Sequence, residues 1–154
     1  HRGRVLRLLL VATGATTADP AGAIAKADAM EASGWNEEAV TPIVAGFFYN
    51  SPPAEKLAEY RAIAMKASQP AAIEAARSNA SLSTLDDLGR ITVPTLIVQG
   101  RYDRARTPEH GALMRSLLPN GALAVIENAG HTPQLEQPLG FHDVALPFLI
   151  ARSP

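Results

Sequence analysis

Two residues, Asp103 and His131, have side chains suited to acid–base chemistry and follow apolar runs of the chain. Asp103 comes shortly after the run Ile91–Gly100, and His131 comes shortly after the run Ala122–Glu127, in an Ala-Gly-His turn. In open α/β sheets, ligands bind beyond the carboxyl ends of the strands, so such loops are expected to hold working side chains. Each residue alone also has an ordinary explanation as part of a turn.

An Asp–His pair forms if the two runs are adjacent parallel strands. The carboxylate would then accept a hydrogen bond from one imidazole nitrogen and fix the tautomer of the ring. It would also stabilise the imidazolium that forms when the other nitrogen takes a proton. The pattern therefore predicts a general base, His131, oriented by Asp103.

The segment around these loops is typical of a βαβ unit. Ile91–Gly100 has strand character, with Pro94 tolerated near its start. A helix is predicted to begin at Thr107-Pro108, and the strand Ala122–Glu127 follows it. Three apolar residues of this helix are expected to face the sheet: Met114, Leu117 and Leu118.

Two further elements complete the predicted core. Val5–Ala12 is a nearly continuous apolar run without alternation, which favours a strand buried on both faces of a parallel sheet over a short helix. The segment from Pro138 to Arg152 is predicted to be a helix, although Pro147 would remove the hydrogen bond to the Asp143 carbonyl and kink it. Its apolar residues at helical spacing are Phe141, Val144, Ala145, Phe148 and Leu149.

Residues 19–90 differ in composition from the flanking segments: they are rich in alanine and interrupted by proline and glycine. A helix of about fourteen residues is predicted between Asp19-Pro20 and Ser33-Gly34. Pro42 implies that a second helix begins at Thr41. Its apolar stripe would contain Val40, Ile43, Val44, Phe47 and Phe48. Two more helices are predicted, one from Ser51-Pro52 and one over 68–80, which makes an inserted helical region or small bundle.

These elements predict an α/β protein with three segments. Residues 1–18 would hold a core strand, 19–90 a helical insertion, and 91–154 the remainder of the core. The order would be strand, helical insertion, strand, helix, strand, helix.

The motifs resemble those of the α/β-hydrolase fold superfamily. Val93–Asp103 is similar to the family's strand and acid loop, and Ala129–Pro138 is similar to its histidine loop. The resemblance implies that Asp103 and His131 are the triad acid and base, in the chain order that this fold uses. It also implies a partial α/β-hydrolase fold with three parallel strands, flanking helices and an inserted helical cap, a mobile region over the active site, at Asp19–Leu88.

The family also requires a G-x-S-x-G nucleophile elbow, or its aspartate-bearing equivalent, and an oxyanion loop. No serine of this sequence lies between two glycines at that spacing. The chain opens at His1 without a methionine and soon enters an apolar run. We therefore expect a C-terminal portion that carries two residues of a triad, has the missing N-terminal half as its partner and is inactive alone.

Five large apolar residues of the helical region could line an acyl or ring pocket beneath the cap, or could form the cap's own small core. They are Met30, Trp35, Phe47, Phe48 and Met65. Three arginines near Asp103 could bind an anionic group, but a solvated loop face explains them better: Arg101, Arg104 and Arg106. His110 and His142 are expected at the surface. No histidine pair has the spacing of a metal site, so we predict no metal. The hydrolase hypothesis requires no cofactor.

Composition narrows the range of partners. The net charge is -1 and the pI is about 6.5, which gives no electrostatic reason to expect nucleic acid or an anionic membrane. Cysteine is absent, which excludes disulfides, thiolate zinc sites and a cysteine nucleophile within this sequence. We expect a cytoplasmic location and a small-molecule substrate.

The leading functional hypothesis is hydrolysis of a small carboxylic ester or lactone by a Ser-His-Asp triad. A carbon–carbon bond hydrolase of ring-fission products is an alternative, although Thr132 stands where those enzymes usually carry an aromatic residue. Dehalogenase and epoxide hydrolase activities depend on whether the nucleophile is an aspartate instead of a serine, and the nucleophile is absent from this sequence. A non-catalytic ligand-binding receptor on the same scaffold is a further alternative, against which the intact Asp103 and His131 loops argue.

Overall fold

The computed structural model describes residues 4–151, which form two compact units. The first contains the described residues up to Ala15 and those from Thr84 onward, and the second is Thr16–Ser83. His1 and Arg152, used above for the start of the chain and the end of the last helix, lie outside the described residues.

The first unit contains a three-stranded parallel sheet, which confirms the predicted fold class. The strands lie in the order β1 (Leu8–Val11), β2 (Thr95–Gly100), β3 (Gly121–Ile126). Helix α5 (Leu85–Leu88) precedes β2, and α6 (Pro108–Leu117) connects β2 to β3. In the register of the last two strands, the carboxyl ends of β2 and β3 lie side by side.

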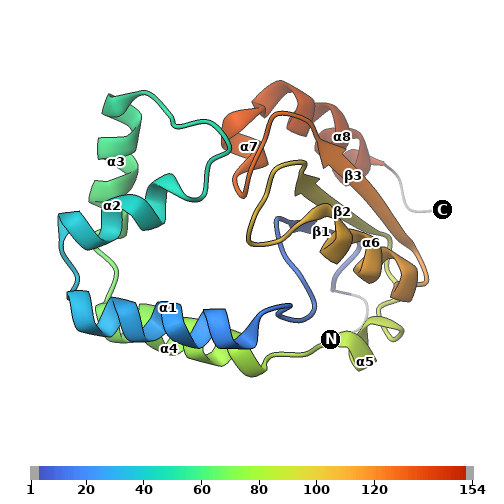
Figure 1. The fold of residues 1–154 in the computed structure, drawn as a ribbon. Coiled ribbons are helices and arrows are strands. Elements are labelled where there is room, and N and C mark those ends of the chain that lie inside the picture. Colours follow the sequence, from blue (N-terminus) through green and yellow to red (C-terminus); the bar gives the residue numbers. More distant parts are fainter. Residues whose placement is uncertain (1–3, 152–154) are drawn as a thin grey trace. The chain divides into compact units, whose positions relative to one another are not determined.

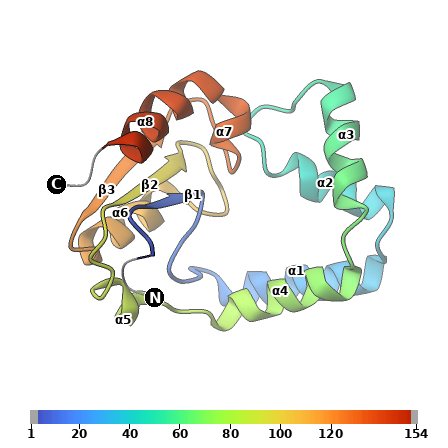
Figure 2. The same ribbon diagram turned by 180° about the vertical axis from the view of Figure 1, so that it is seen from behind.

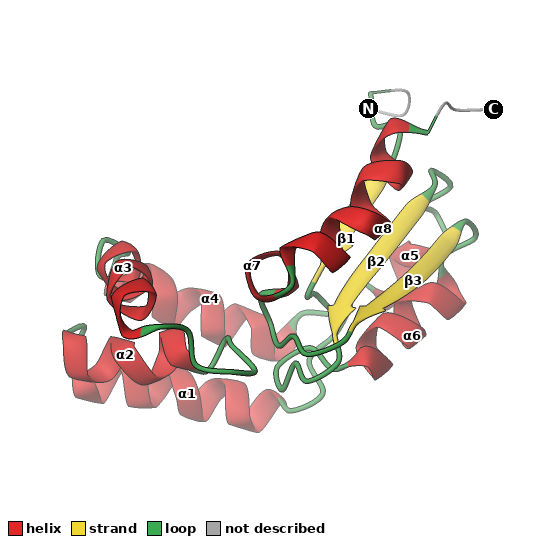
Figure 3. Cartoon of the chain, turned by 90° about the horizontal axis from the view of Figure 1, so that it is seen from above, coloured by secondary structure: helices red, strands yellow, loops and turns green. Residues whose placement is uncertain are grey.

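Helices cover both faces of this sheet, as Figure 3 shows. On one face, α6 packs Met114 against Ile97, and on the other, α8 (Pro138–Ile150) packs Phe148 near Val98. All six residues of β2 are buried because successive side chains point to opposite faces and both faces are covered. The acid loop therefore follows the most deeply buried strand of this unit.

Three expectations about the core are corrected by the structure. The residues of β1 are half-buried and not fully buried, because β1 has a neighbouring strand on one side within the described residues. Leu117 on α6 is 40% exposed and does not face the sheet as Met114 does, and Leu149 on α8 is 48% exposed. The buried positions next to Leu117 are Met114, one turn earlier, and Leu118, and the half-buried position next to Leu149 is Phe148.

The second unit is built from four helices, shown from two sides in Figures 1 and 2. They are α1 (Pro20–Ser33), α2 (Glu37–Ala45), α3 (Ala54–Ala64) and α4 (Gln69–Ser81). Helices α1 and α4 lie side by side, and α2 packs on α3. The Asp19 carboxylate caps α1 by accepting a hydrogen bond from the Gly22 amide at 2.8 Å, and Gly34 ends the helix with a left-handed φ of 74°.

The predicted start of the second helix at Thr41 is wrong. Helix α2 begins at Glu37, because the Asn36 side chain accepts a hydrogen bond from the Ala39 amide and caps an earlier turn. Pro42 lies inside the helix and cannot donate to the carbonyl one turn before it. Phe47 and Phe48 fall beyond the end of α2, so the predicted apolar stripe is shorter than expected.

The two ends of the helical unit meet. Thr16 and Ser83 pair in an antiparallel bridge. In the first unit, the Thr84 amide donates to the Ala15 carbonyl at 2.8 Å. Across residues 4–151, none of the helices is long and apolar enough to span a bilayer.

Candidate active site

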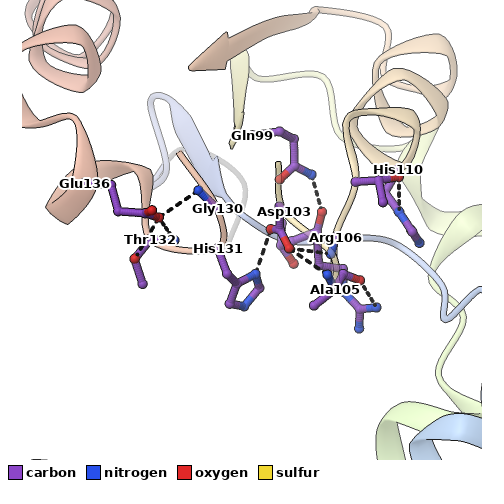
Figure 4. Close-up of polar contacts among 11 residues, drawn as sticks. Gln99, Asp103, Ala105, Arg106, His110, Gly130, His131, Thr132 and Glu136 are labelled. Carbon is purple, nitrogen blue, oxygen red and sulfur yellow. Dashed lines mark hydrogen bonds and ion pairs between the residues drawn. The ribbon is translucent and has the colours of Figure 1, made fainter. Parts of the chain in front are cut away.

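The predicted pair is formed in the structure, as Figure 4 shows. The Nδ1 atom of His131 lies 2.7 Å from Oδ2 of Asp103. The two side chains meet because Gly100 at the end of β2 is in register with Ile126 at the end of β3, and each residue sits in the loop that follows. An ionised carboxylate can only accept hydrogen bonds, so in the tautomer that donates from Nδ1 to Asp103, Nε2 is the nitrogen that can take up a proton.

The acid loop holds the Asp103 carboxylate in one orientation. Its Oδ1 atom accepts hydrogen bonds from the backbone amides of Ala105 and Arg106, both at 2.8 Å. The side chain has 0% exposure, whereas that of His131 is 28% exposed. Hydrogen bonds to a charged acceptor are among the stronger ones in proteins. The Asp103 carboxylate is therefore held in place and buried from solvent, while the His131 imidazole is partly exposed to solvent.

Gly100 allows the two loops to approach each other. A Cβ atom built on Gly100 would overlap the Gly130 carbonyl oxygen and lie 2.6 Å from the Ala129 carbonyl oxygen. The Tyr102 amide donates to that Ala129 carbonyl at 2.9 Å, which joins the acid loop to the histidine loop through the backbone. Any larger residue at Gly100 would push the two loops apart.

The histidine loop makes a sharp turn at Asn128, which has a left-handed φ of 56°. Asparagine adopts this conformation more readily than most residues. The loop then leads into the short helix α7 (Pro133–Glu136), and Pro133 is fully buried. This turn directs His131 back toward the acid loop.

Two polar residues at the site were missed by sequence reasoning. Gln99 is fully buried near the end of β2, and its Nε2 donates to the Thr13 carbonyl at 2.6 Å, which joins the carboxyl ends of β1 and β2. Glu136 accepts hydrogen bonds from the residues on either side of His131. The available signals were a glutamine inside an otherwise apolar strand and a glutamate closely following the histidine.

The arginines of the acid loop are engaged by the protein itself. Arg101 donates to Glu127 Oε1 from both Nε at 2.9 Å and Nη2 at 2.8 Å. These hydrogen bonds hold the pKa of the Arg101 guanidinium above its usual value. Arg106 donates to the Ala105 carbonyl at 3.3 Å, and Arg104 is exposed. Their contacts fit a solvated loop face.

The five predicted substrate-binding residues all lie in the helical unit. Trp35 donates from Nε1 to the Ala64 carbonyl at 3.3 Å, and Phe48 stacks on Tyr60 with ring centroids 5.4 Å apart. Phe47 is 41% exposed. Met30 and Met65 are half-buried.

The described residues contain two further histidines, His110 and His142. His110 is half-buried on α6, with Nδ1 3.3 Å from the Thr107 hydroxyl, and was expected at the surface. His142 is exposed on α8. Within residues 4–151, no group of three or more histidine, aspartate or glutamate side chains is placed to hold a metal ion.

Comparisons with known proteins give consistent results. The esterase from Exiguobacterium antarcticum matches 96% of this chain and 58% of its own, with a TM-score of 0.86 and 20% identity, a likeness of fold alone. Est816, described as an N-acyl homoserine lactone degrading enzyme, matches 96% of this chain and 60% of its own, with a TM-score of 0.72 and 26% identity.

A curated relative from Pseudomonas putida is 40% identical over 62 residues. It is 2-hydroxy-6-oxononadienedioate/2-hydroxy-6-oxononatrienedioate hydrolase 2, and the match covers 40% of this chain and 22% of the relative. The chain thus spans well under two thirds of the proteins that it resembles.

The family model described as "Alpha/beta hydrolase family" matches residues 3–144, which include both loops and the sheet that supports them. That match extends over most of the chain and agrees with the parallel sheet and with the solved structures of the same fold. The chain therefore belongs to the alpha/beta hydrolase family.

Proposed function

We propose that the protein hydrolyses a small carboxylic ester or lactone, with His131 as general base and acid and Asp103 as the residue that orients it. The observation that carries the proposal is the 2.7 Å contact between His131 Nδ1 and the buried Asp103 carboxylate. This geometry leaves Nε2 as the atom that exchanges protons with the reacting groups.

In the proposed reaction, Nε2 of His131 takes the proton of a nucleophilic hydroxyl as its oxygen attacks the ester carbonyl. Asp103 stabilises the imidazolium, which then gives the proton to the departing alkoxide, leaving an acyl-enzyme and an alcohol. Water, activated by the same nitrogen, releases the carboxylic acid. We propose that the hydroxyl and the oxyanion donors come from an N-terminal part of the protein, since the chain matches 58% of the esterase's length.

We also propose the aromatic and methionine side chains of the helical unit as substrate-contacting groups. Their supporting observation is that Phe47 and Trp35 expose part of their rings. No cofactor is needed for the proposed reaction.

A second candidate, hydrolysis of a carbon–carbon bond in a ring-fission product, is favoured by the Pseudomonas putida relative. The same base could serve it, because that reaction also adds water across a cleaved bond. The substrate would be a dicarboxylate in the relative's case, as its name states.

The test uses the full-length protein with a panel containing a short-chain ester, a lactone and a 2-hydroxy-6-oxo-dienoate. Asp103→Asn and His131→Ala should each lower kcat strongly, by about 10⁴-fold for the aspartate if it acts as in serine protease triads. His142→Ala, an exposed histidine of the same unit, is the control and should retain wild-type turnover.

The preferred substrate separates the candidates. Turnover of the dienoate with negligible ester hydrolysis would favour the second candidate. Wild-type rates in both Asp103→Asn and His131→Ala would contradict the proposed roles. Ligand binding without any turnover would indicate a receptor.

A further inference from the structure

Glu136, the last residue of α7, binds the backbone on both sides of His131. Its Oε1 atom accepts a hydrogen bond from the Gly130 amide at 2.7 Å and lies 3.4 Å from the Thr132 amide nitrogen, which also donates to it. The Thr132 hydroxyl donates to the same oxygen at 3.1 Å. Figure 4 shows these contacts beside the Asp103–His131 pair.

This arrangement restrains the segment that carries the imidazole. Residues 127–132 have neither strand nor helix pairing to fix them, so their amides need other acceptors. One carboxylate oxygen gathers the amides before and after His131, and hydrogen bonds to a charged acceptor are stronger than neutral ones. Glu136 therefore restrains the backbone on both sides of His131.

The supporting helix is itself fixed. Pro133 at the first position of α7 is fully buried, and the Glu136 amide donates to the Thr132 carbonyl at 3.0 Å. Hydrogen bonds therefore join Thr132 and Glu136 in both directions: the Glu136 amide donates to the Thr132 carbonyl, and the Thr132 amide and hydroxyl donate to the Glu136 carboxylate. Movement of the carboxylate relative to His131 is limited by these hydrogen bonds.

We infer that Glu136 is a positioning residue for the proposed base, acting through the Gly130 and Thr132 backbone to hold His131 Nδ1 against Asp103. The effect on turnover rests on the proposed function, whereas the effect on the His131–Asp103 hydrogen bond does not. A displacement of about 1 Å in a catalytic group can cost about 100-fold in rate.

The experiment compares Glu136→Ala, Glu136→Gln and Glu136→Asp in the full-length protein. Glutamine keeps an acceptor oxygen at the same reach without the charge, and aspartate keeps the charge but withdraws the oxygen by one methylene. If the position of the acceptor oxygen matters, Glu136→Gln should weaken the Asp103–His131 pair least. Glu136→Asp and Glu136→Ala should weaken it more. If Glu136 contributes only its charge, aspartate should match wild type and glutamine should not.

The matched control is Glu127→Ala. It removes the same charge from the preceding part of the same loop, but Glu127 Oε1 binds the Arg101 side chain and not the His131 backbone. The control should leave the pair unchanged.

Three readouts are made on each variant. Nuclear magnetic resonance follows the Nδ1 proton of His131, hydrogen exchange follows the Gly130 and Thr132 amides, and kinetics separate kcat from KM. For Glu136→Ala we expect loss of the Nδ1 proton signal, at least tenfold faster exchange at both amides, and a 10- to 100-fold lower kcat with KM within about twofold.

Folded Glu136→Ala with wild-type Nδ1 signal and amide exchange would overturn the inference. Should the alanine variant fail to fold, the other two variants decide, and an aspartate variant equal to or better than glutamine would overturn it. If the wild type hydrolyses nothing in the panel, the proposed function fails, and the Nδ1 proton signal and the amide exchange rates still decide the role of Glu136.

Discussion

At the scale of single residues, the site depends on backbone contacts as much as on the two side chains that meet. Asp103 and His131 could be predicted because their residue types and their positions just after two apolar runs are visible in the sequence. Gly100, Gln99 and Glu136 could not, since a close approach, a buried amide and a carboxylate bound to backbone amides appear only when two loops are placed in three dimensions.

Gly100→Ala should disturb the site without altering either member of the pair. The added methyl group would overlap backbone carbonyl oxygens of the histidine loop, which cannot rotate away as a side chain can. We expect a loss of about 1–3 kcal/mol in the free energy of unfolding, as for other overpacked positions. The His131 Nδ1 proton signal should weaken as well.

Urea unfolding of the full-length protein measures the first effect. Gly89→Ala is the control, because a Cβ atom there meets nothing within 4 Å. Equal stability of the Gly100 and Gly89 variants would show that the loops can separate at no cost.

At the scale of elements, the sequence predicted helices where a cap and a stop were both present. Helix α1 matches its prediction because Asp19, Pro20 and Gly34 mark its ends. The predicted start of α2 is wrong because Pro42 favours a start at Thr41, whereas the Asn36 side chain caps a turn that begins earlier. The short helices α5 and α7 are too brief for periodicity to reveal them.

Asp19→Ala should destabilise the start of α1 by about 1 kcal/mol, the usual cost of removing a side-chain cap. The Asp19 carboxylate holds the Gly22 amide, so exchange of that amide with solvent should accelerate. Ser68→Ala is the matched control, since Ser68 precedes α4 without a side-chain hydrogen bond to it. Equal losses in the two variants would contradict the importance of the Asp19 contact.

At the scale of the whole molecule, the first unit exposes several large apolar side chains. The strand β1 has one neighbour among the described strands, and Val5 and Leu6 before it are 51% and 69% exposed. On α8, Leu139 is 79% exposed and Ile150 is 77% exposed. The sequence predicted the strands but not their exposure, because the burial of β1 depends on its neighbours on both sides, and the described residues place a strand on one side of it.

The isolated 154-residue polypeptide should therefore associate or aggregate, since an unpaired apolar strand edge is a template for pairing with other chains. We also expect it to lack esterase activity. Light scattering and thermal unfolding of the polypeptide, alone and mixed with the proposed N-terminal part, measure the effect. A monodisperse polypeptide that melts cooperatively on its own would contradict this expectation.

The bridge between Thr16 and Ser83 has a consequence for how such a protein can change. Because the Thr84 amide reaches the Ala15 carbonyl, the points where the chain leaves and rejoins the sheet unit are close enough for a short turn to join them. We therefore expect changes in the length of residues 16–83 to leave the pairing of β1 with β2 intact.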